Sequence, residues 1–377
     1  MKIVLVPSWY SSDRAPTRGS FIKEQALAIA RRGLDVAVVA FDRDASMPLL
    51  RVCRSVEAGL RHVRIAVPAP WHRLFGFYAP QLLANRLRAV LKEEAPDLVH
   101  AHAVRPAGVV TGMALANSDI PWCMTEHSGP LRDFWWTAHG HRQIDSAYRS
   151  AGRLFGVSNS LVRDMRHYFP QGAAHAQILY NGIDTRLFAR FQRSSPSTGA
   201  RLLFVGSLTE GKGVYDLLEA VCRLPARIDW TLSLVGGGPL REPLAQRASL
   251  MGMSDRLHWL GSVSHDAMPD VYARHDLLVV SSLAETFSLV SAEALACGLP
   301  VVATRCGGPE EVIGPLGLPL VTPGDPAALG EAILGMLGRL SAFDREGAAK
   351  SIEQRFSMTA LAARLETIYA DMVQEPK

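Results

Sequence analysis

The sequence of 377 residues predicts an α/β protein made of two Rossmann-like, doubly wound domains that face each other across a cleft. Two observations lead to this prediction. In each half of the chain, short apolar runs alternate with stretches whose apolar residues recur at helical spacing. A polar, turn-prone segment, Phe191–Gly199, separates the two halves and is the expected linker. Strands that alternate with helices form parallel sheets, and ligands bind at the carboxyl ends of such strands.

The first half, residues 1–190, begins with a complete strand–helix–strand unit. Ile3–Pro7 is a short apolar run, and Phe21–Arg32 has apolar residues at helical spacing. Gly33 stands where a helix C-cap belongs, and Asp35–Ala40 is the next expected strand. The other elements expected in this half are a helix over Gln81–Glu94 and strands over Asp97–His100, Trp122–Thr125 and Arg153–Val157.

The second half, residues 200–356, repeats the alternation more regularly. Its expected strands cover Arg201–Val205, Thr231–Val235, Leu257–Leu260, Asp276–Val280 and Pro300–Ala303. Its expected helices cover Val214–Arg223, Leu240–Met251, Met268–Arg274 and Leu289–Cys297. The last segment, residues 357–377, contains an amphipathic helix over Met358–Val373 that could pack back on the first domain.

The composition is that of a soluble globular protein without a membrane-spanning helix. Apolar residues make up 48% and charged residues 20%, and no apolar run reaches the roughly 18 residues that a spanning helix needs. The first apolar run, Met1–Pro7, is too short for a signal peptide, so we expect a cytoplasmic protein. Five cysteines without a Cys-x-x-Cys pair argue against a disulfide framework and a zinc site.

Charge is distributed unevenly along the chain. Residues 1–190 carry 24 lysine and arginine against 15 aspartate and glutamate, whereas the whole chain has a net charge of +4. The basic half favours an anionic partner, such as a phosphorylated acceptor, an acidic glycan or an acidic lipid surface, the last as peripheral contact with the inner face of a membrane. An arginine-rich solvated surface explains the same counts. Nucleic acid is not an expected partner, because no basic motif with interleaved aromatic residues occurs.

The densest chemical signal is the segment Ser281–Gly298, where a buried strand ends, a polar turn follows and a helix begins. The free N–H groups at the start of that helix form an expected anion pocket. Glu285 lies in the turn and Glu293 about two turns inside the helix. A carboxylate beside an anion pocket suits the vicinal hydroxyls of a sugar or ribose. For either glutamate alone, an ordinary helix residue is the simpler explanation.

The stretch from Glu285 to Thr304 resembles the donor-site motif of family 4 glycosyltransferases, which have the GT-B fold. Further segments match the family in chain order: Thr17–Phe21, His100–His102, Thr125–Ser128, Asn181–Asp184, Phe204–Val214, Val235–Leu240, Leu260–Val263 and Cys306–Glu311. The resemblance extends over nearly the whole chain. It implies a retaining enzyme of polysaccharide biosynthesis type, which moves a hexose from a nucleoside-diphosphate sugar to a glycan, lipid-linked or small-molecule acceptor.

The resemblance also implies roles for individual residues. Glu285 would contact the donor hexose, Glu293 the ribose diol, and His127 the transferred sugar. The other residues implied for donor binding are Lys212 and the backbone amides of Phe287, Ser288 and Leu289 on the diphosphate, Val263 against the base, and Gly19 in a loop that approaches the diphosphate.

One departure from the family concerns the leaving group. Ser207 stands where the family commonly has an arginine beside the lysine, so more of the phosphate charge must rest on Lys212 and the helix terminus, or on Arg18 or Arg305. On the acceptor side, the candidate residues are His102, Arg18 and Trp135.

No metal or other cofactor is expected, because no Asp-x-Asp motif occurs and fixed dipoles with a lysine can stabilise the departing diphosphate. No covalent nucleophile is apparent, which agrees with attack on the same face as the leaving group. His127 could act as a general base, but positioning a sugar hydroxyl is the interpretation that we favour.

Three other functions fit a fold of this kind. A sugar-nucleotide epimerase would convert its donor with no acceptor present. A phosphorylase would need a pyridoxal-binding lysine context, which the sequence lacks. A non-catalytic nucleotide-sugar or glycan-binding module would not need the intact set of Glu285, Glu293, Lys212 and His127.

Overall fold

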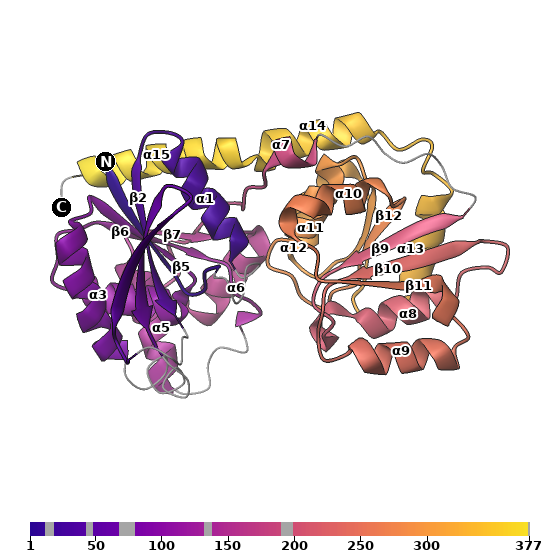
Figure 1. The fold of residues 1–377 in the computed structure, drawn as a ribbon, viewed down its shortest axis with the longest axis horizontal. Helices are drawn as coiled ribbons and strands as arrows, with labels where there is room; N and C mark the ends of the chain where they lie inside the picture. Colours follow the sequence, from indigo (N-terminus) through magenta and orange to yellow (C-terminus); the bar gives the residue numbers. More distant parts are fainter. Residues whose placement is uncertain (12–18, 43–47, 68–79, 132–137, 190–198, 376–377) are drawn as a thin grey trace. The chain divides into compact units, whose positions relative to one another are not determined.

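The structure, a computed structural model, describes residues 1–11, 19–42, 48–67, 80–131, 138–189 and 199–375. These residues form two compact α/β units, which are described one at a time (Figure 1). The first unit comprises Met1–Gly182 together with Met358–Lys377, and the second comprises Ile183–Ser357. The chain therefore leaves the first unit once and returns to it at its C-terminal end.

The first unit is built on an eight-stranded sheet in the order β3-β4-β2-β1-β5-β6-β7-β8. Its strands are β1 (Lys2–Pro7), β2 (Asp35–Asp42), β3 (Val52–Glu57), β4 (Leu60–Ala66), β5 (Leu98–His102), β6 (Trp122–Glu126), β7 (Arg153–Gly156) and β8 (Gln177–Ile178). Every neighbouring pair is parallel except β3 and β4. The central strands β1, β5 and β6 are almost wholly buried, as strands covered on both faces must be.

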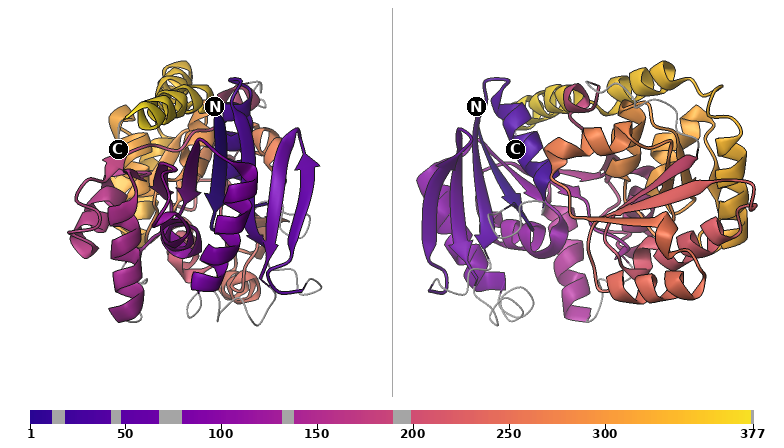
Figure 2. Two further views of the ribbon diagram at one scale, coloured as in Figure 1. Left: turned by 90° about the vertical axis from the view of Figure 1, so that its left-hand side faces the viewer. Right: turned by 45° about the vertical axis from the view of Figure 1, so that its right-hand side comes forward.

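The antiparallel β3–β4 hairpin forms one edge of this sheet and is absent from the sequence prediction (Figure 2). Its turn, Ala58-Gly59, has a positive φ at both positions, +51° and +81°. This backbone is typical of a two-residue hairpin turn, in which asparagine or glycine is usual at the first position. Alanine at that position conceals the signal in the sequence.

Helices cover the first sheet: α1 (Ser20–Ala30), α3 (Pro80–Glu94), α4 (Val109–Leu115), α5 (Ala138–Ser150), α6 (Asn159–Tyr168) and α15 (Met358–Gln374). The helices α1 and α15, from opposite ends of the chain, pack together in one hydrophobic core. That core includes Ile22 and Ile29 of α1 and Leu365 and Tyr369 of α15, all fully buried. The C-terminal helix is therefore part of the first unit.

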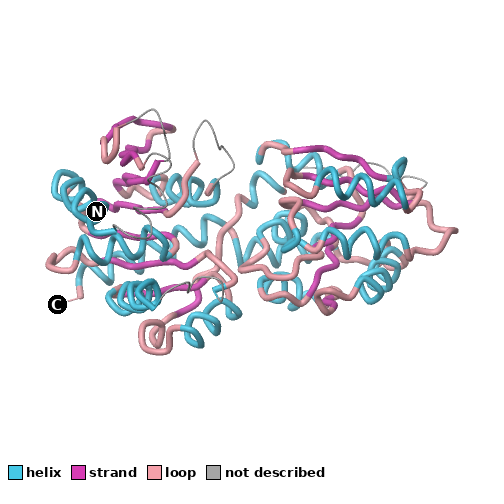
Figure 3. The backbone as a smooth tube through the Cα atoms, turned by 90° about the horizontal axis from the view of Figure 1, so that it is seen from below, coloured by secondary structure: helices cyan, strands magenta, loops and turns pink. Residues whose placement is uncertain are grey.

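The second unit is built on a fully parallel, six-stranded sheet in the order β11-β10-β9-β12-β13-β14. Its strands are β9 (Ala200–Val205), β10 (Trp230–Val235), β11 (Leu257–Gly261), β12 (Leu277–Val280), β13 (Val301–Thr304) and β14 (Leu320–Val321). Its helices are α7 (Thr185–Phe188), α8 (Val214–Cys222), α9 (Arg241–Leu250), α10 (Met268–Ala273), α11 (Leu289–Ala296), α12 (Gly308–Ile313), α13 (Pro326–Leu337) and α14 (Arg345–Phe356), and they flank the strands (Figure 3).

Each sheet has one point where the strand order reverses direction. In the first unit it lies between β1 and β5, and in the second between β9 and β12. The loops that follow two such strands diverge and leave a crevice at the carboxyl edge, where ligands of doubly wound sheets bind. The loops that follow β1 and β5, and those that follow β9 and β12, are therefore the expected places for a ligand.

The division between the units differs from the expected linker. The chain passes from the first unit to the second between Gly182 and Ile183, so α7 belongs to the second unit. At the same place Ile183 N donates to Phe356 O at 2.8 Å, next to the point where the chain returns. Of the segment expected to be the linker, residues 191–198 lie outside the described residues.

Candidate active site

The loop after β9 presents Lys212 at the reversal point of the second sheet. It closes in a 3₁₀ turn, Glu210–Lys212, that ends on Gly213 with a φ of +58°. Two bonds join this turn to the loop after β12: Ser281 Oγ donates to Lys212 O at 2.9 Å, and Leu283 N donates to Gly211 O at 2.9 Å. The two loops therefore form one local structure.

Lys212 and Glu285 form an ion pair within this structure. The Lys212 Nζ atom lies 2.5 Å from Glu285 Oε1, and Ser282 Oγ donates to the same oxygen at 2.7 Å. The Lys212 side chain is 29% exposed and that of Glu285 is 14% exposed. The ammonium is thus held at the strand ends by a carboxylate and remains accessible to a ligand. The fold thus brings together Lys212 and Glu285, which the sequence predicts for two different parts of the donor.

Gly213 is the point where this loop pair is most sensitive to substitution. A Cβ atom there would lie 1.9 Å from Ser281 O, and the backbone is in the left-handed region. We expect Gly213→Ala to lower the free energy of unfolding by more than about 2 kcal/mol, because overpacking adds to backbone strain. Gly211→Ala, two residues away with no atom within 4 Å of the new Cβ, is the matched control and should be near neutral. Urea unfolding of both variants tests this expectation.

The start of α11 lies beside the same ion pair. Ser288 is its N-cap with a φ of +77°, and no side chain caps its first turn. The Ser288 hydroxyl is instead 2.7 Å from Ser291 Oγ. The helix therefore presents N–H groups and the positive end of its dipole without an acidic residue in the first turn. The anion pocket predicted from Phe287, Ser288 and Leu289 corresponds to this helix start.

The loop after β13 packs tightly beneath this pocket. Gly308 N donates to Glu285 O at 2.8 Å, and Glu285 N donates to Cys306 O at 3.0 Å. A Cβ atom on Gly308 would lie 2.4 Å from the backbone of Phe287. The backbone on either side of the pocket is therefore fixed by its neighbours. Arg305, the proposed substitute cation, is exposed at the end of β13.

Glu293 is buried within α11 rather than solvated on its surface. Tyr272 Oη donates to Glu293 Oε2 at 2.8 Å, and His265 Nε2 lies 3.5 Å from Glu293 Oε1. Burial and the neighbouring carboxylate raise the pKa of Tyr272 well above its usual range. The Glu293 carboxylate, which is predicted to bind the ribose diol, is thus already oriented by Tyr272 and His265. Neither of these two residues is predicted from the sequence.

The other residues predicted to bind the donor in this unit follow neighbouring strands of the second sheet. Ser207, after β9, is exposed, and its hydroxyl is 3.4 Å from that of Thr209. Val263 is half-buried in the loop after β11. A Cβ on Gly236, after β10, would lie 2.0 Å from Gly206 O, so these two loops are also in contact.

In the first unit, Gly19 caps the N-terminus of α1 with a φ of +68°. A Cβ atom there would lie 2.6 Å from Trp9 O. The close contact with Trp9 therefore requires glycine at position 19 for a structural reason. The expected approach of this loop to a diphosphate would be a second reason. Of the predicted acceptor residues, Arg18 and Trp135 lie outside the described residues.

His127 follows β6 at the carboxyl edge of the first sheet. Its Nε2 atom is 3.0 Å from His102 Nδ1, and the ring of Phe21 lies 4.9 Å away. His102 is fully buried, stacked between His100 and His127. This corrects the prediction for His102: it supports His127 from below, and its side chain does not line a surface that an acceptor could reach.

These histidines are neutral at ordinary pH. Burial lowers the pKa of His127 to about 3, and the side chain of Asn181 opposes that shift. Burial and the ring of His127 lower the pKa of His100 to about 3. Burial, with His100 and His127 nearby, also lowers the pKa of His102 well below its usual range. The first unit therefore presents an uncharged imidazole at this edge.

Glu126, immediately before His127, is a site residue to which the sequence analysis assigns no role. It is fully buried, yet its carboxylate accepts five hydrogen bonds. The donors are the backbone N–H groups of Val104, His127 and Ser128 and the hydroxyls of Ser128 and Tyr148. The sequence signal that could have identified it is a glutamate inside the matched segment Thr125–Ser128. Its burial and its five hydrogen bonds are visible only in the structure.

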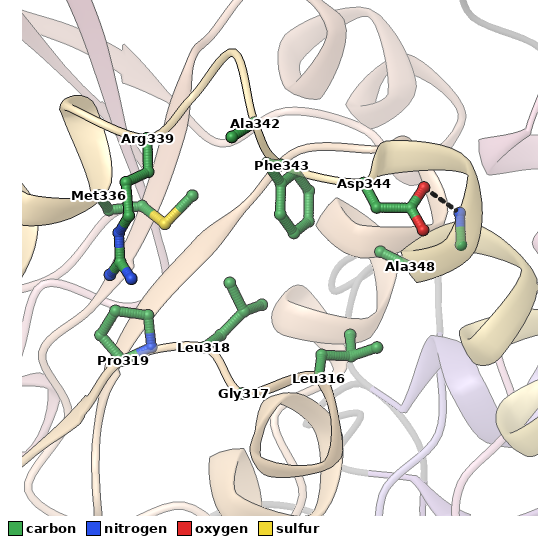
Figure 4. Close-up of a pocket in the computed structure, with 11 residues that line it drawn as sticks. Leu316, Gly317, Leu318, Pro319, Met336, Arg339, Ala342, Phe343, Asp344 and Ala348 are labelled. Carbon is green, nitrogen blue, oxygen red and sulfur yellow. Dashed lines mark hydrogen bonds between the residues drawn. The ribbon is translucent and has the colours of Figure 1, made fainter.

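A cavity of about 460 Å³ lies elsewhere in the second unit (Figure 4). Its lining comes from the segment before β14, the end of α13 and the start of α14, and includes Leu318, Met336 and Phe343. None of Lys212, Glu285 and Glu293 lines it. Across the described parts of the chain, no cluster of three or more histidine, cysteine or acidic residues is arranged to hold a metal ion.

Comparison with known proteins agrees with this geometry. Residues 19–187 match the family model described as Glycosyltransferase Family 4, and residues 199–339 match that described as Glycosyl transferases group 1. The chain is 26% identical over 310 residues to the N-acetyl-alpha-D-glucosaminyl L-malate synthase of Bacillus anthracis, covering 78% of this chain and 80% of that protein.

Two solved structures show the same fold. Sucrose-phosphate synthase from Thermosynechococcus elongatus has a TM-score of 0.82 and 19% identity, covering 99% of both chains. HepE of Anabaena, in complex with UDP, has a TM-score of 0.75 and 22% identity, covering 98% of this chain and 100% of that one. Two α/β units with parallel sheets of this kind define the GT-B class. The chain belongs to the family 4 glycosyltransferases.

No helix in the described part of the chain is both long and apolar enough to span a bilayer. Two arginines of α3 donate hydrogen bonds within the protein. Arg86 Nε donates to Leu50 O at 3.1 Å, and Arg88 donates to the carbonyl groups of Met113 and Ala114.

Proposed function

We propose that the protein transfers a hexose from a nucleoside-diphosphate sugar to a hydroxyl acceptor, with retention of the anomeric configuration and without a metal ion. The observation that carries this proposal is the Lys212–Glu285 ion pair beside the uncapped start of α11, at the reversal point of the second sheet. Cation, helix terminus and carboxylate are the groups that a sugar diphosphate requires. HepE, a similar structure, holds UDP or UDP-glucose.

Lys212 and the start of α11 stabilise the leaving group. When the bond to the sugar breaks, negative charge develops on the β-phosphate. An ammonium and oriented N–H groups that are already in place stabilise that charge without reorganisation. Ser207 contributes one neutral hydroxyl at the position where the family has arginine, so Lys212 carries most of the positive charge near the phosphates.

The two glutamates bind hydroxyl groups. Lys212 and Ser282 both donate to Oε1 of the Glu285 carboxylate, and we assign Oε2 to the donor hexose. Glu293, held by Tyr272 and His265, binds the ribose diol, and Val263 lies near the base. In the first unit, His127 contacts the transferred sugar. A pre-oriented carboxylate loses little freedom on binding, which favours affinity.

Binding of nucleotides tests the donor half of the proposal. We expect one of UDP, GDP and ADP to raise the melting temperature of the protein, because it binds only the folded state. Glu293→Ala should weaken binding of that nucleotide by about 1–3 kcal/mol, since it removes the ribose contacts. Isothermal titration of the wild-type protein and the variant measures the change.

The matched control is Glu331→Ala, which removes an exposed glutamate from α13. It should bind the nucleotide as the wild-type protein does. If Glu293→Ala binds with unchanged affinity, the ribose assignment is wrong. If no nucleotide of the panel binds, the donor class itself is wrong.

A further inference from the structure

The ion pair between Lys212 and Glu285 occupies a cation that a diphosphate would use. Lys212 Nζ lies 2.5 Å from Glu285 Oε1, and the same oxygen accepts from Ser282 Oγ at 2.7 Å. In the part of the chain that the structure describes, Lys212 Nζ makes no other hydrogen bond or ion pair. A ligand anion at Lys212 must therefore compete with the Glu285 carboxylate for the ammonium.

Glu285 is the fixed member of this pair. Its backbone is bonded through both of its polar groups: Glu285 N donates to Cys306 O at 3.0 Å, and Gly308 N donates to Glu285 O at 2.8 Å. The hydroxyl of Ser282 holds the carboxylate itself, and the side chain is only 14% exposed. A carboxylate held in this way has little freedom to move away from an anion that enters the site.

Lys212 is the mobile member of the pair. Its backbone is fixed, because Lys212 N donates to Thr209 O at 3.1 Å and Lys212 O accepts from Ser281 Oγ at 2.9 Å. Its side chain is 29% exposed. A lysine ammonium is a point charge on a flexible four-carbon stem, with three N–H donors. The ammonium can therefore turn from Glu285 toward a phosphate without a change in the backbone.

The carboxylate of Glu285 also repels a diphosphate at this place. The first turn of α11 contains no acidic residue. Glu310, in the first turn of α12, is engaged at its own helix start, where its Oε2 atom accepts from Gly307 N at 2.8 Å. Glu285, in contrast, faces the ammonium that the phosphates need. Two anionic groups beside one ammonium repel each other, so Glu285 weakens the binding of a free diphosphate.

We propose that Glu285 competes with the diphosphate for Lys212 and thereby promotes release of the nucleoside diphosphate after transfer. While the donor is intact, hydroxyl groups of the hexose donate to Glu285, and the ammonium turns to the β-phosphate. Once the sugar has left with the acceptor, those hydrogen bonds are lost and the carboxylate draws the ammonium back. The same glutamate therefore favours the intact donor over the spent nucleotide. This inference rests on the proposed function for the identity of the ligand.

Binding of the spent nucleotide tests the inference. With the member of the UDP, GDP and ADP panel that stabilises the wild-type protein, Glu285→Gln and Glu285→Ala should each bind at least about five-fold more tightly. Two unit charges about 4 Å apart in bulk water repel with an energy that corresponds to about this change in affinity. The alanine variant excludes a new hydrogen bond from the glutamine amide as the cause. Isothermal titration measures the affinity, and stopped-flow displacement of the nucleotide should show slower dissociation from both variants.

A comparison of product with donor separates this role from a structural one. Both variants lose the contact with the hexose, so the matching sugar nucleotide among UDP-glucose, GDP-mannose and ADP-glucose should gain less affinity than the free nucleotide does. The ratio of the two affinities should therefore shift toward the free nucleotide. A variant that only loosened the loops would weaken the binding of both ligands. Glu331→Gln, which removes an exposed carboxylate from α13, is the matched control and should bind both ligands as the wild-type protein does.

The two proposals fail in different ways, and inorganic pyrophosphate distinguishes them because it carries the competing charges without base or sugar. If no nucleotide binds but pyrophosphate binds more tightly to both Glu285 variants than to the wild-type protein, the proposed function is wrong and the competition for Lys212 stands. If a nucleotide binds the wild-type protein and neither Glu285 variant binds it more tightly, the carboxylate serves only to orient Lys212 and the inference is wrong.

Discussion

Lys212→Ala is expected to lower turnover by about 100- to 1000-fold while the fold stays intact. The loss of one charge-stabilising group at a leaving oxygen has effects of this size. The structure adds a second cause. Lys212 neutralises Glu285 across 2.5 Å, so its removal leaves a carboxylate unpaired where the diphosphate must bind. Steady-state kinetics with the donor identified by the nucleotide panel measure the fall in kcat.

A double variant separates the two causes. In Lys212→Ala combined with Glu285→Gln, the unpaired charge is absent, and any activity regained relative to Lys212→Ala reports its repulsion of the phosphates. Lys350→Ala, which removes an exposed lysine on α14, is the control for lost positive charge. Wild-type turnover in Lys212→Ala would show that the lysine has no role at the leaving group.

The histidine stack is expected to make the protein unstable in acid. His100, His102 and His127 all have a pKa below the value near 6.5 of the unfolded chain. Below that value the unfolded chain binds three protons that the folded protein does not. Above pH 6.5 these three histidines are neutral in both states and do not lower the free energy of unfolding. As the pH falls from 6.5 toward 3, protonation of the unfolded chain lowers the free energy of unfolding. In that window the free energy of unfolding should fall by about 4 kcal/mol per pH unit from these three groups.

Urea unfolding at a series of pH values measures this slope. His100→Gln keeps an amide that can bond Tyr369 or Thr125 but cannot titrate, so the slope should fall by about 1.4 kcal/mol per pH unit. Leu87→Ala, a buried change on α3 that removes no titratable group, should lower the free energy of unfolding without changing the slope. An unchanged slope in His100→Gln would mean that His100 is charged in the folded protein or does not titrate differently on unfolding.

The alternating strand and helix pattern predicts much of the fold because each central strand of a parallel sheet is buried on both faces. Short apolar runs such as Leu202–Phe204 and Leu277–Val280 therefore stand out in the sequence. The β3–β4 hairpin does not stand out in the sequence. Its edge strand is not buried on both faces, since Val56 is 71% exposed, and its turn uses alanine. The unit boundary at Gly182 was also missed, since polar composition indicates turns but says nothing about which unit a short helix packs on.

The predicted donor residues lie close together because a strand end and the following helix start are adjacent in the chain. Glu285 and Ser288 are in one segment, and the fold brings Lys212 to them from the neighbouring strand. The partners of Glu293 and His127 could not be predicted from the sequence. Tyr272 and His102 act through contacts between residues far apart in sequence, and each has an ordinary explanation as a core residue.

The central claim is that the Lys212 site cleaves a sugar nucleotide with retention. Carbon-13 NMR of the anomeric centre, with a donor labelled at C1, follows that reaction directly. We expect a product with the same anomeric configuration as the donor, formed together with one nucleoside diphosphate and about 100- to 1000-fold more slowly by Lys212→Ala. A product of the opposite configuration, or equal rates for the wild-type protein and Lys212→Ala, would contradict it.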